Sequence, residues 1–341
     1  MTPKPGAVLR RSILPLLVGL MVTGCAGRVG PGTTGVVERG LGADPPVEFT
    51  YLGTGGWIIR RGADVVLAAP FFSNPSFLGV GLTAIESDTA AIDRGMAGYD
   101  VSDAGVILVG HSHYDHLMDV PHIAKRYAPE ARIVSTLTTR NLLGEWSGLM
   151  ERTDLSEDHA ADQEHMGSWM EYGHGVRILP LLSDHAPHFN GLELYAGTVA
   201  RPREEAPETA ADWLGGETFA FLVDFLDSSG DVAFRIYYQD AVTAPPYGFA
   251  PDSLIAEHPV DVAIFVPATF DQVEWHPEAF VENLQPERVL LGHWEDFFIP
   301  MELNTRSVLA ADIEHFESRL RRVFDGEFWR PEIGTVFRFG R

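Results

Sequence analysis

Four side chains that can bind a metal ion lie within six positions of one segment. The apolar run Val106–Gly110 has the length of a buried strand, and it leads directly into His111-Ser-His-Tyr-Asp-His116. Because residues two apart in an extended backbone point the same way, His111 and His113 can converge on one ion while Asp115 and His116 turn toward another. Neutral imidazole and carboxylate groups are ligands of zinc and similar divalent metals. The segment therefore predicts a metal site at the end of a strand.

This segment resembles the signature of the metallo-β-lactamase superfamily. That signature is His-x-His-x-Asp-His after a strand, followed by a distant His, a distant Asp and a final His. The resemblance extends over most of residues 47–341. It implies an α/β (α+β) fold, the αββα metallo-β-lactamase sandwich, in which two mixed sheets are flanked by helices and the site lies at one edge of the packed sheets.

The other signature positions have matches in the same order, each following the end of a predicted strand. They are His185 after Val176–Leu182, Asp240 after Phe234–Gln239, and His293 after Arg288–Gly292. The resemblance implies that the first ion is bound by His111, His113 and His185, and the second by Asp115, His116 and His293, with Asp240 bridging both. His188 is an alternative to His185, because Pro187 leaves the local geometry open.

Two divalent ions, which we expect to be zinc, are the cofactors that this ligand set implies. Two such ions about 3.5–4 Å apart can share a hydroxide whose pKa is drawn toward neutrality, and can stabilise the oxyanion formed by attack on a carbonyl or phosphoryl group. Asp115 is the candidate catalytic residue that orients the hydroxide or takes its proton. His276 is the candidate for a substrate-facing or proton-donating residue. Nearby aromatic residues, including Trp275, Phe297 and Phe298, could line an apolar pocket, but core packing is the favoured expectation for the Phe pairs.

One position departs from the superfamily pattern. An early strand of the family ends in Asp-Pro, whose Asp supports the metal site, but here the strand reads Val65-Val-Leu-Ala-Ala69-Pro70. Loss of such a supporting group commonly costs about 10–100-fold in metal affinity or activity. Asp184, Asp271 and Asp296 are candidates to replace it. A site with a single ion, or a binding protein without catalysis, is the alternative that Ala69 suggests.

The rest of the body alternates short strands with helices, as expected for sheets covered by helices on their outer faces. Besides the strands named above, apolar runs predict strands at residues 49–52, 57–60, 65–68, 132–135, 192–200, 218–225, 262–266 and 335–339. Helices are predicted at 120–127, 138–146, 277–283 and 305–323. Asp227-Ser-Ser-Gly-Asp231 predicts a hairpin turn, whereas 148–172 and 201–216 are expected to be surface loops.

The first 24 residues are predicted to be a lipoprotein signal peptide. Positive charges at Lys4, Arg10 and Arg11 precede the apolar run Ile13–Val22, which is too short to span a membrane. The run leads to Val22-Thr-Gly-Cys25, which resembles the bacterial lipobox, and Cys25 is the only cysteine of the chain. We expect lipidation of Cys25, a flexible tether over residues 25–46 and a hydrolase domain over 47–341. The protein would then be anchored in the bacterial cell envelope, facing the periplasm or the exterior.

The charge balance limits the partners. Lys and Arg total 25 against 48 Asp and Glu, which gives a formal net charge of −23. A chain with this charge repels the phosphate backbone, so nucleic acid is excluded as a partner. The expected partners are a small-molecule or lipid-like substrate and a membrane reached through the lipid on Cys25.

These features together predict a metal-dependent hydrolase of a phosphodiester or ester bond, with a lipid-like envelope compound as substrate. The segments Leu52–Trp57 and Leu290–Trp294 are loosely similar to the branch containing N-acyl phosphatidylethanolamine phospholipase D and ascorbate 6-phosphate lactonase. One alternative is a lactonase or β-lactamase acting on a small cyclic ester or amide, which the absence of an Arg or Lys cluster near the motifs favours. The other is a non-catalytic envelope binding protein on the same scaffold.

Overall fold

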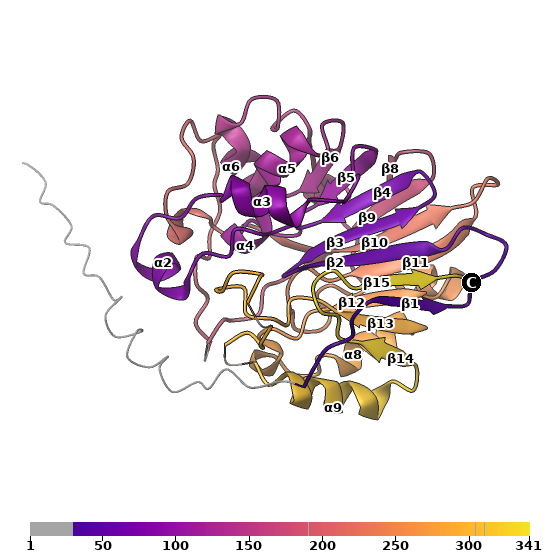
Figure 1. Ribbon diagram of the computed structural model, residues 1–341. Coiled ribbons are helices and arrows are strands. Elements are labelled where there is room, and N and C mark those ends of the chain that lie inside the picture. The colour runs from indigo at the N-terminus through magenta and orange to yellow at the C-terminus, as the bar shows by residue number, and fades with distance from the viewer. Residues whose placement is uncertain (1–29, 190, 304, 310) are drawn as a thin grey trace, which may run out of the picture.

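Two β-sheets packed face to face form the centre of the protein (Figure 1). The structure, a computed structural model, describes residues 30–189, 191–303, 305–309 and 311–341, so the predicted signal peptide and Cys25 lie outside the described residues. In spatial order, the first sheet contains β1 (Val36–Arg39), β15 (Val336–Phe339), β2 (Val47–Gly53), β3 (Gly56–Arg61), β4 (Asp64–Ala68), β5 (Ala104–Leu108), β6 (Arg132–Ser135) and β7 (Thr153–Leu155). The second contains β14 (Glu327–Trp329), β13 (Arg288–Leu291), β12 (Val262–Phe265), β11 (Val232–Tyr238), β10 (Thr218–Leu226), β9 (Val176–Ser183) and β8 (Met170–Tyr172).

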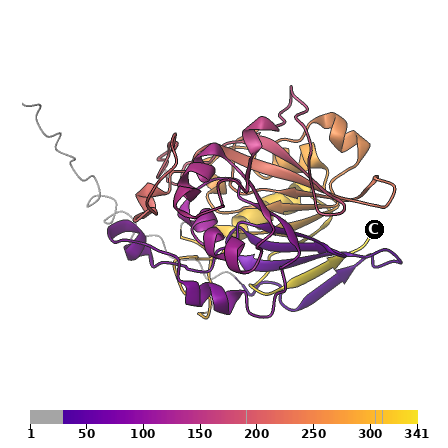
Figure 2. The same ribbon diagram turned by 90° about the horizontal axis from the view of Figure 1, so that it is seen from above.

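Helices cover the outer face of each sheet (Figure 2). The first sheet is covered by α3 (Thr89–Gly95), α4 (Tyr114–Leu117), α5 (Val120–Arg126) and α6 (Leu137–Leu142). The second is covered by α7 (Asp252–Glu257), α8 (Glu278–Leu284) and α9 (Ile313–Val323). The short helix α2 (Phe77–Leu82) projects from one end of the molecule and buries none of its side chains. Within the described ranges, no helix has the length and apolarity needed to cross a membrane.

The apolar runs of the sequence arise because most strands are buried on both faces. In β10, Phe221 and Val223 pack between the two sheets, whereas Ala220 and Leu222 pack against the outer helices. The four layers are helix, sheet, sheet and helix, and both sheets mix parallel with antiparallel pairs. The predicted αββα sandwich is therefore confirmed.

Most of the predicted strands form close to their predicted bounds, among them 132–135, 218–225, 262–266 and 335–339. The hairpin between β10 and β11 forms as predicted, with the Asp227 amide donating to the Asp231 carbonyl oxygen at 2.9 Å. The prediction of a strand over 192–200 is wrong, because the backbone carbonyls of Tyr195 and Gly197 accept from loop amides rather than from a strand. The predicted helix 305–323 begins only at Ile313, after the Asp312 side chain caps it.

The tether predicted over residues 25–46 is wrong for its described part, because residues from Thr33 onward belong to the folded body. The Thr33 amide donates to the Arg330 carbonyl oxygen at 2.7 Å, and β1 pairs in parallel with β15. Without β1, the edge of β15 would leave backbone donors and acceptors unpaired. The side chains of β1 are mostly exposed, which is why the segment shows no apolar pattern. Similarly, the predicted loop 148–172 contains the short edge strands β7 and β8.

A buried ion pair ties the second sheet to α7. Arg235 on β11 donates to both carboxylate oxygens of Asp224 on β10, at 2.7 and 2.8 Å, and both side chains are fully buried. The same guanidinium donates to the backbone carbonyl oxygens of Leu254 and His258. The charges are therefore compensated inside the outer layer, where an unpaired carboxylate would be costly.

We expect Arg235→Met to lower the free energy of unfolding by about 3 kcal/mol, because it removes the two-point partner of a buried carboxylate and the donor to two buried carbonyl oxygens. Asp224 keeps a second partner, because Arg177 donates to it at 2.9 Å. The control is Arg338→Met, whose ion pairs with Glu38 and Glu48 are solvent-exposed. That variant should lose less than about 1 kcal/mol. Denaturant unfolding followed by circular dichroism measures both, and equal losses would contradict the importance given to the buried pair.

Candidate metal centre

The predicted ligands lie together at one edge of the two sheets. His111 and His113 follow β5, Asp115 and His116 lie on α4, His185 follows β9, Asp240 follows β11, and His293 follows β13. The parallel neighbours of β5 and of β13 point their carboxyl ends to the same edge, which is where open α/β sheets collect functional side chains. Gly110 permits the close approach of the two sheets, because a Cβ at this position would lie 2.4 Å from the Asp240 Cβ.

The ligand atoms fall into groups that a metal ion could join. Candidate ligand atoms of His111, His113 and His185 lie within 4.8 Å of one another, and the same limit holds for Asp115, His116 and His293. Among the described residues, the structure thus brings together the side chains that the sequence assigned to the first and second ions.

Asp240 joins the two groups. One of its carboxylate oxygens lies 2.7 Å from His111 Nδ1 and the other lies 3.0 Å from His116 Nδ1. The Tyr238 hydroxyl donates to the second oxygen at 2.7 Å. The position between both groups is the one that a bridging carboxylate requires.

Burial and mutual charge set the protonation of these groups. Burial lowers the pKa of His111, and it lowers the pKa of His113 and His185 well below the usual range, which leaves the three rings neutral. Burial acts against ionisation of Asp240, but His116 and the hydrogen bonds from His111 and His116 hold its pKa well below the usual value. Neutral imidazoles and an ionised carboxylate are the forms that bind metal ions.

The candidates His185 and His188 differ in their hydrogen bonds. His185 Nδ1 lies 2.6 Å from the Ala186 carbonyl oxygen, and the ring belongs to the first ligand group. His188 stacks on His185 outside that group, and its Nδ1 accepts from the Leu194 amide at 3.2 Å. Burial lowers the pKa of His188 to about 4. A backbone carbonyl on one ring nitrogen with the other directed at a metal is the usual arrangement of a histidine ligand, so the geometry favours His185.

His276 does not face the cavity in this structure. Its side chain is fully buried, its Nε2 lies 3.0 Å from Gln239 Oε1, and burial lowers its pKa to about 3. Gln239 precedes Asp240 and also accepts from the Val266 amide. The structure therefore separates His276 from the ligand set and places it among the packing residues behind β11.

The three acids considered as replacements for an Asp at position 69 bond elsewhere. Asp184 is exposed and caps the amide of His185, Asp271 is exposed at the rim, and Asp296 pairs with Arg306. Ala69 itself is buried, with a positive φ of 27°. Within the described residues, none of the three acids hydrogen-bonds a ligand side chain.

Glu295 is the supporting residue that the sequence analysis missed. Its buried carboxylate accepts from the Tyr51 hydroxyl and from the Thr54 amide. The His293 amide in turn donates to the Tyr51 oxygen at 3.0 Å and to the Thr54 carbonyl oxygen at 2.7 Å. Glu295 therefore holds the backbone that carries His293. The only sequence signal was an acid two positions after a predicted ligand.

This support is needed because the turn at His293 is strained. His293 has a φ of 50° and Thr54, which contacts it, has a φ of 53°. Non-glycine residues rarely adopt this left-handed conformation unless the surrounding contacts impose it. The hydrogen bonds around Glu295 supply those contacts, which aim the His293 ring at Asp115, where its Nε2 lies 3.3 Å from Oδ2.

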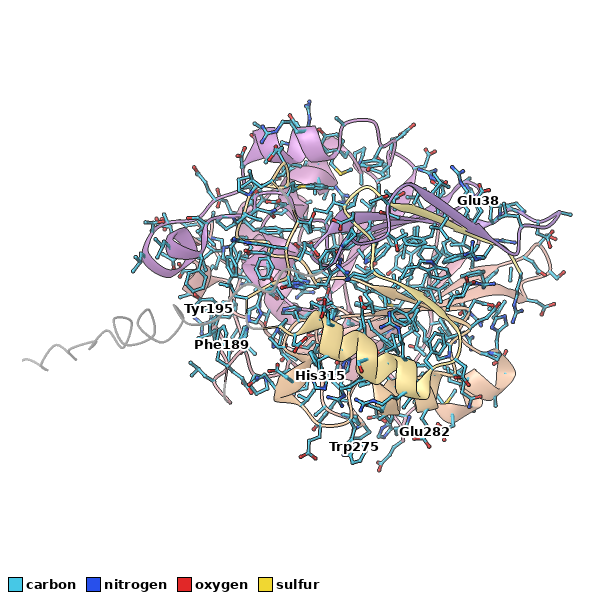
Figure 3. All side chains as sticks on the ribbon, turned by 60° about the horizontal axis from the view of Figure 1, so that its bottom comes forward. Glu38, Phe189, Tyr195, Trp275, Glu282 and His315 are labelled. Atoms are coloured by element: carbon cyan, nitrogen blue, oxygen red, sulfur yellow. The ribbon has the colours of Figure 1, made fainter. Side chains whose placement is uncertain are left out.

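A cavity of about 260 Å³ opens onto the ligand set. Its walls come from α2, from the loop after β9 and from the segment after β13. Their apolar residues include Phe77, Leu78, Phe189, Leu194, Phe297 and Phe298. Figure 3 shows Phe189 and Tyr195 side by side at one end of the molecule, whereas Trp275 lies on another side. Phe297 and Phe298 thus line the cavity, although core packing was the favoured expectation for them, and Trp275 does not line it.

The residues present fit a pair of divalent ions. Each group offers three ligand atoms that face one another, and Asp240 is shared between groups. Two buried imidazole nitrogens, His113 Nε2 and His293 Nδ1, have no hydrogen-bond partner among the described residues. Imidazole with carboxylate suits zinc and also iron, so the donor set indicates transition metals without selecting one.

Comparison with solved structures supports the fold. A metallo hydrolase from the hyperthermophilic archaeon Ignicoccus hospitalis matches with a TM-score of 0.52 at 16% identity, over 87% of this chain and 99% of that one. A possible metal-dependent hydrolase from Veillonella parvula matches with a TM-score of 0.50 at 12% identity, over 85% and 98%. The metallo-β-lactamase fold protein YhfI from Bacillus subtilis has a TM-score of 0.48 at 12% identity, over 86% and 100%. No family model matches the sequence, and neither does any curated protein. With the layers described above, the likenesses to the first two of these structures show that the chain shares their two-sheet αββα fold.

We expect Glu295→Gln to weaken binding of the second metal ion by about 10–100-fold. Tyr51 and Thr54 donate to different carboxylate oxygens, and an amide replaces one of these acceptors with an NH₂ donor. The matched control is Asp296→Asn, since Asp296 is equally buried but bonds Arg306. Competition with a chromogenic zinc chelator measures the affinity, and circular dichroism checks the fold. Equal affinities in the two variants would show that Glu295 does not position His293.

Proposed function

We propose that the protein is a metal-dependent hydrolase that cleaves a carboxylic ester with an apolar acyl chain. The observation that carries this proposal is the apolar cavity whose floor is formed by the two ligand groups and Asp240. A substrate that fills the cavity presents its reacting group to the ligand set. The likeness in fold to two structures described as metal-dependent hydrolases agrees with this chemistry.

The lining favours an ester over a phosphodiester. No lysine or arginine occurs among the described residues that line the cavity. Phosphate groups are usually bound by such cations or by backbone amides, whereas an acyl chain gains about 0.8 kcal/mol for each buried methylene group. Leu78 on α2 remains 59% exposed while lining the cavity, so an acyl chain lying against α2 would cover it.

The ligand residues have distinct roles in this proposal. His111, His113 and His185 would hold one ion, and Asp115, His116 and His293 the other, with Asp240 between them. When bound, two such ions supply a water that is nucleophilic near neutral pH and a positive charge beside the ester. The pKa of Asp115 is lowered: burial opposes this, but His116 and His293 outweigh it, so its carboxylate stays ionised. It can therefore accept a hydrogen bond from the attacking water and orient it.

The complete ligand set favours catalysis over the binding-only alternative. A protein that only bound a ligand on this scaffold would need neither neutral buried imidazoles nor a carboxylate shared between two groups. Ala69 was the reason for that alternative, and Glu295 now supports the ligand backbone from another direction.

The test is an assay of ester hydrolysis by the purified protein loaded with zinc. We expect about two ions per chain, and turnover of a p-nitrophenyl octanoate at least tenfold faster than of the acetate, since the longer chain buries more apolar surface. Asp240→Asn should abolish turnover, and a chelator should do the same reversibly. The same assay is run with three other substrates: an N-acyl homoserine lactone, a chromogenic β-lactam and bis(p-nitrophenyl) phosphate. Preference for the phosphodiester, or turnover that survives Asp240→Asn, would refute the ester assignment.

We also propose that the protein is a lipoprotein of the bacterial cell envelope, anchored through Cys25. The support is the charged start, the apolar run and the lipobox-like segment of the sequence. Cys25 precedes Gly30, where the described part begins, by five positions. Five residues span at most about 17 Å, so a lipid on Cys25 would hold the folded body close to the membrane.

If this is correct, Cys25→Ser should move the full-length protein from the membrane to the soluble fraction, because a serine cannot carry the thioether-linked lipid. Fractionation of expressing cells, followed by detection with an antibody against the folded domain, measures how the protein is distributed between the membrane and soluble fractions. Metabolic labelling with an alkyne fatty acid provides the control, and membrane association without labelling would contradict the anchor.

A further inference from the structure

One histidine of the cavity belongs to neither ligand group. His188 lines the cavity, and its ring stacks on that of His185 with the centroids 4.7 Å apart and an angle of 16° between the planes. Its centroid lies 5.5 Å from that of His113. A side chain in this position faces the part of a substrate that approaches the first ligand group.

Hydrogen bonds fix which nitrogen of each stacked ring carries the proton. His188 Nδ1 accepts from the Leu194 amide at 3.2 Å, so this nitrogen keeps its lone pair and the proton of the neutral ring is on Nε2. His185 is the reverse, because its Nδ1 lies 2.6 Å from the Ala186 carbonyl oxygen and must donate. The two neighbouring rings therefore offer opposite groups: His185 offers a lone pair at Nε2, and His188 offers an N–H.

The His188 ring is held in place before any substrate binds. Besides the Leu194 contact, the His188 amide donates to the Leu192 carbonyl oxygen at 2.9 Å, which closes a turn around the ring. Within the described residues, Nε2 has no hydrogen-bond partner, and it is not among the buried unpartnered atoms, so it is open to the cavity. A preorganised donor of this kind requires little rearrangement during a reaction.

We propose that His188 is a further catalytic residue, which donates a hydrogen bond from Nε2 to the carbonyl oxygen of the ester as that oxygen gains negative charge. This inference rests on the proposed function. The proton stays on Nε2, so no bond to the histidine forms or breaks. The cavity lining favours such a neutral donor, because the described lining residues include no lysine or arginine. Tyr195 also lines the wall, with its ring centroid 6.4 Å from that of His113.

The tautomer is tested without any activity assay. In the metal-free, ¹⁵N-histidine-labelled protein, long-range ¹H–¹⁵N spectra distinguish a ring protonated at Nε2 from one protonated at Nδ1. We expect His188 to be protonated at Nε2 and His185 at Nδ1, with signals assigned by their loss in His188→Gln and His185→Gln. A His188 ring protonated at Nδ1 would overturn the proposal.

Three variants test the donor itself. His188→Gln can place an amide N–H near Nε2, whereas His188→Asn can keep an acceptor for Leu194 but has no donor at that position, and His188→Phe has neither. We expect all three to bind as much zinc as the wild type. The Asn and Phe variants should lose about 100-fold in kcat with little change in KM, as for loss of one oxyanion donor, and Gln should restore at least tenfold.

Two results would refute the role of His188. Loss of zinc from His188→Phe would make it a metal ligand, and wild-type kcat in His188→Asn would make it a packing residue. Failure of the proposed function is recognised separately, because a zinc-loaded wild type that hydrolyses no ester refutes that function whatever the variants do. In that case the His188 proposal falls with it, while the tautomer result still reports the ring geometry.

Discussion

The structure depends on keeping five imidazoles and two carboxylates together in the protein interior. Removing such groups from water is unfavourable unless each meets a partner or stays uncharged. The chain uses both means. His113 and His185 are held neutral by burial, whereas Asp240 is held ionised by hydrogen bonds from two rings and a tyrosine. A polar cluster that is stable only in this arrangement constrains every element that contributes to it.

The sandwich meets this constraint by placing strand ends against one another. Parallel neighbours in both sheets end at the same edge, and Gly110 lets the end of β5 approach Asp240 at the end of β11. The backbone at His293 is energetically unfavourable because it is left-handed. The contacts of Glu295 with Tyr51 and Thr54 stabilise this turn. Glu295, together with Tyr51 and Thr54, thus supports the backbone of His293 in a chain that has Ala at position 69.

The floor and the walls of the cavity differ in polarity. The floor is polar and built on strand ends, whereas the walls are loops and the projecting helix α2, whose side chains are apolar and unburied. The loop after β9 serves both parts, because it brings Phe189 and Leu194 to the wall and also holds the His188 ring beside His185. The floor can therefore remain constant while loop changes alter which substrate fits.

The sequence alone predicted the fold class and the side chains that the structure gathers at one edge of the sheets, because His111 to His116 are close in the chain and the other candidates each follow an apolar strand. It could not decide between His185 and His188, since that depends on which ring nitrogen meets a backbone carbonyl. It also misplaced His276, whose aromatic surroundings bury it behind β11, and it missed Glu295, whose partners lie more than 200 positions away. Residues 192–200 resemble a strand in sequence, but Leu194 and Tyr195 line the cavity and Val199 packs against the core outside any sheet. A local sequence pattern indicates which residues are buried and how candidate ligands are spaced along the chain. Only the tertiary structure decides which distant polar atoms meet and which apolar surfaces stay exposed.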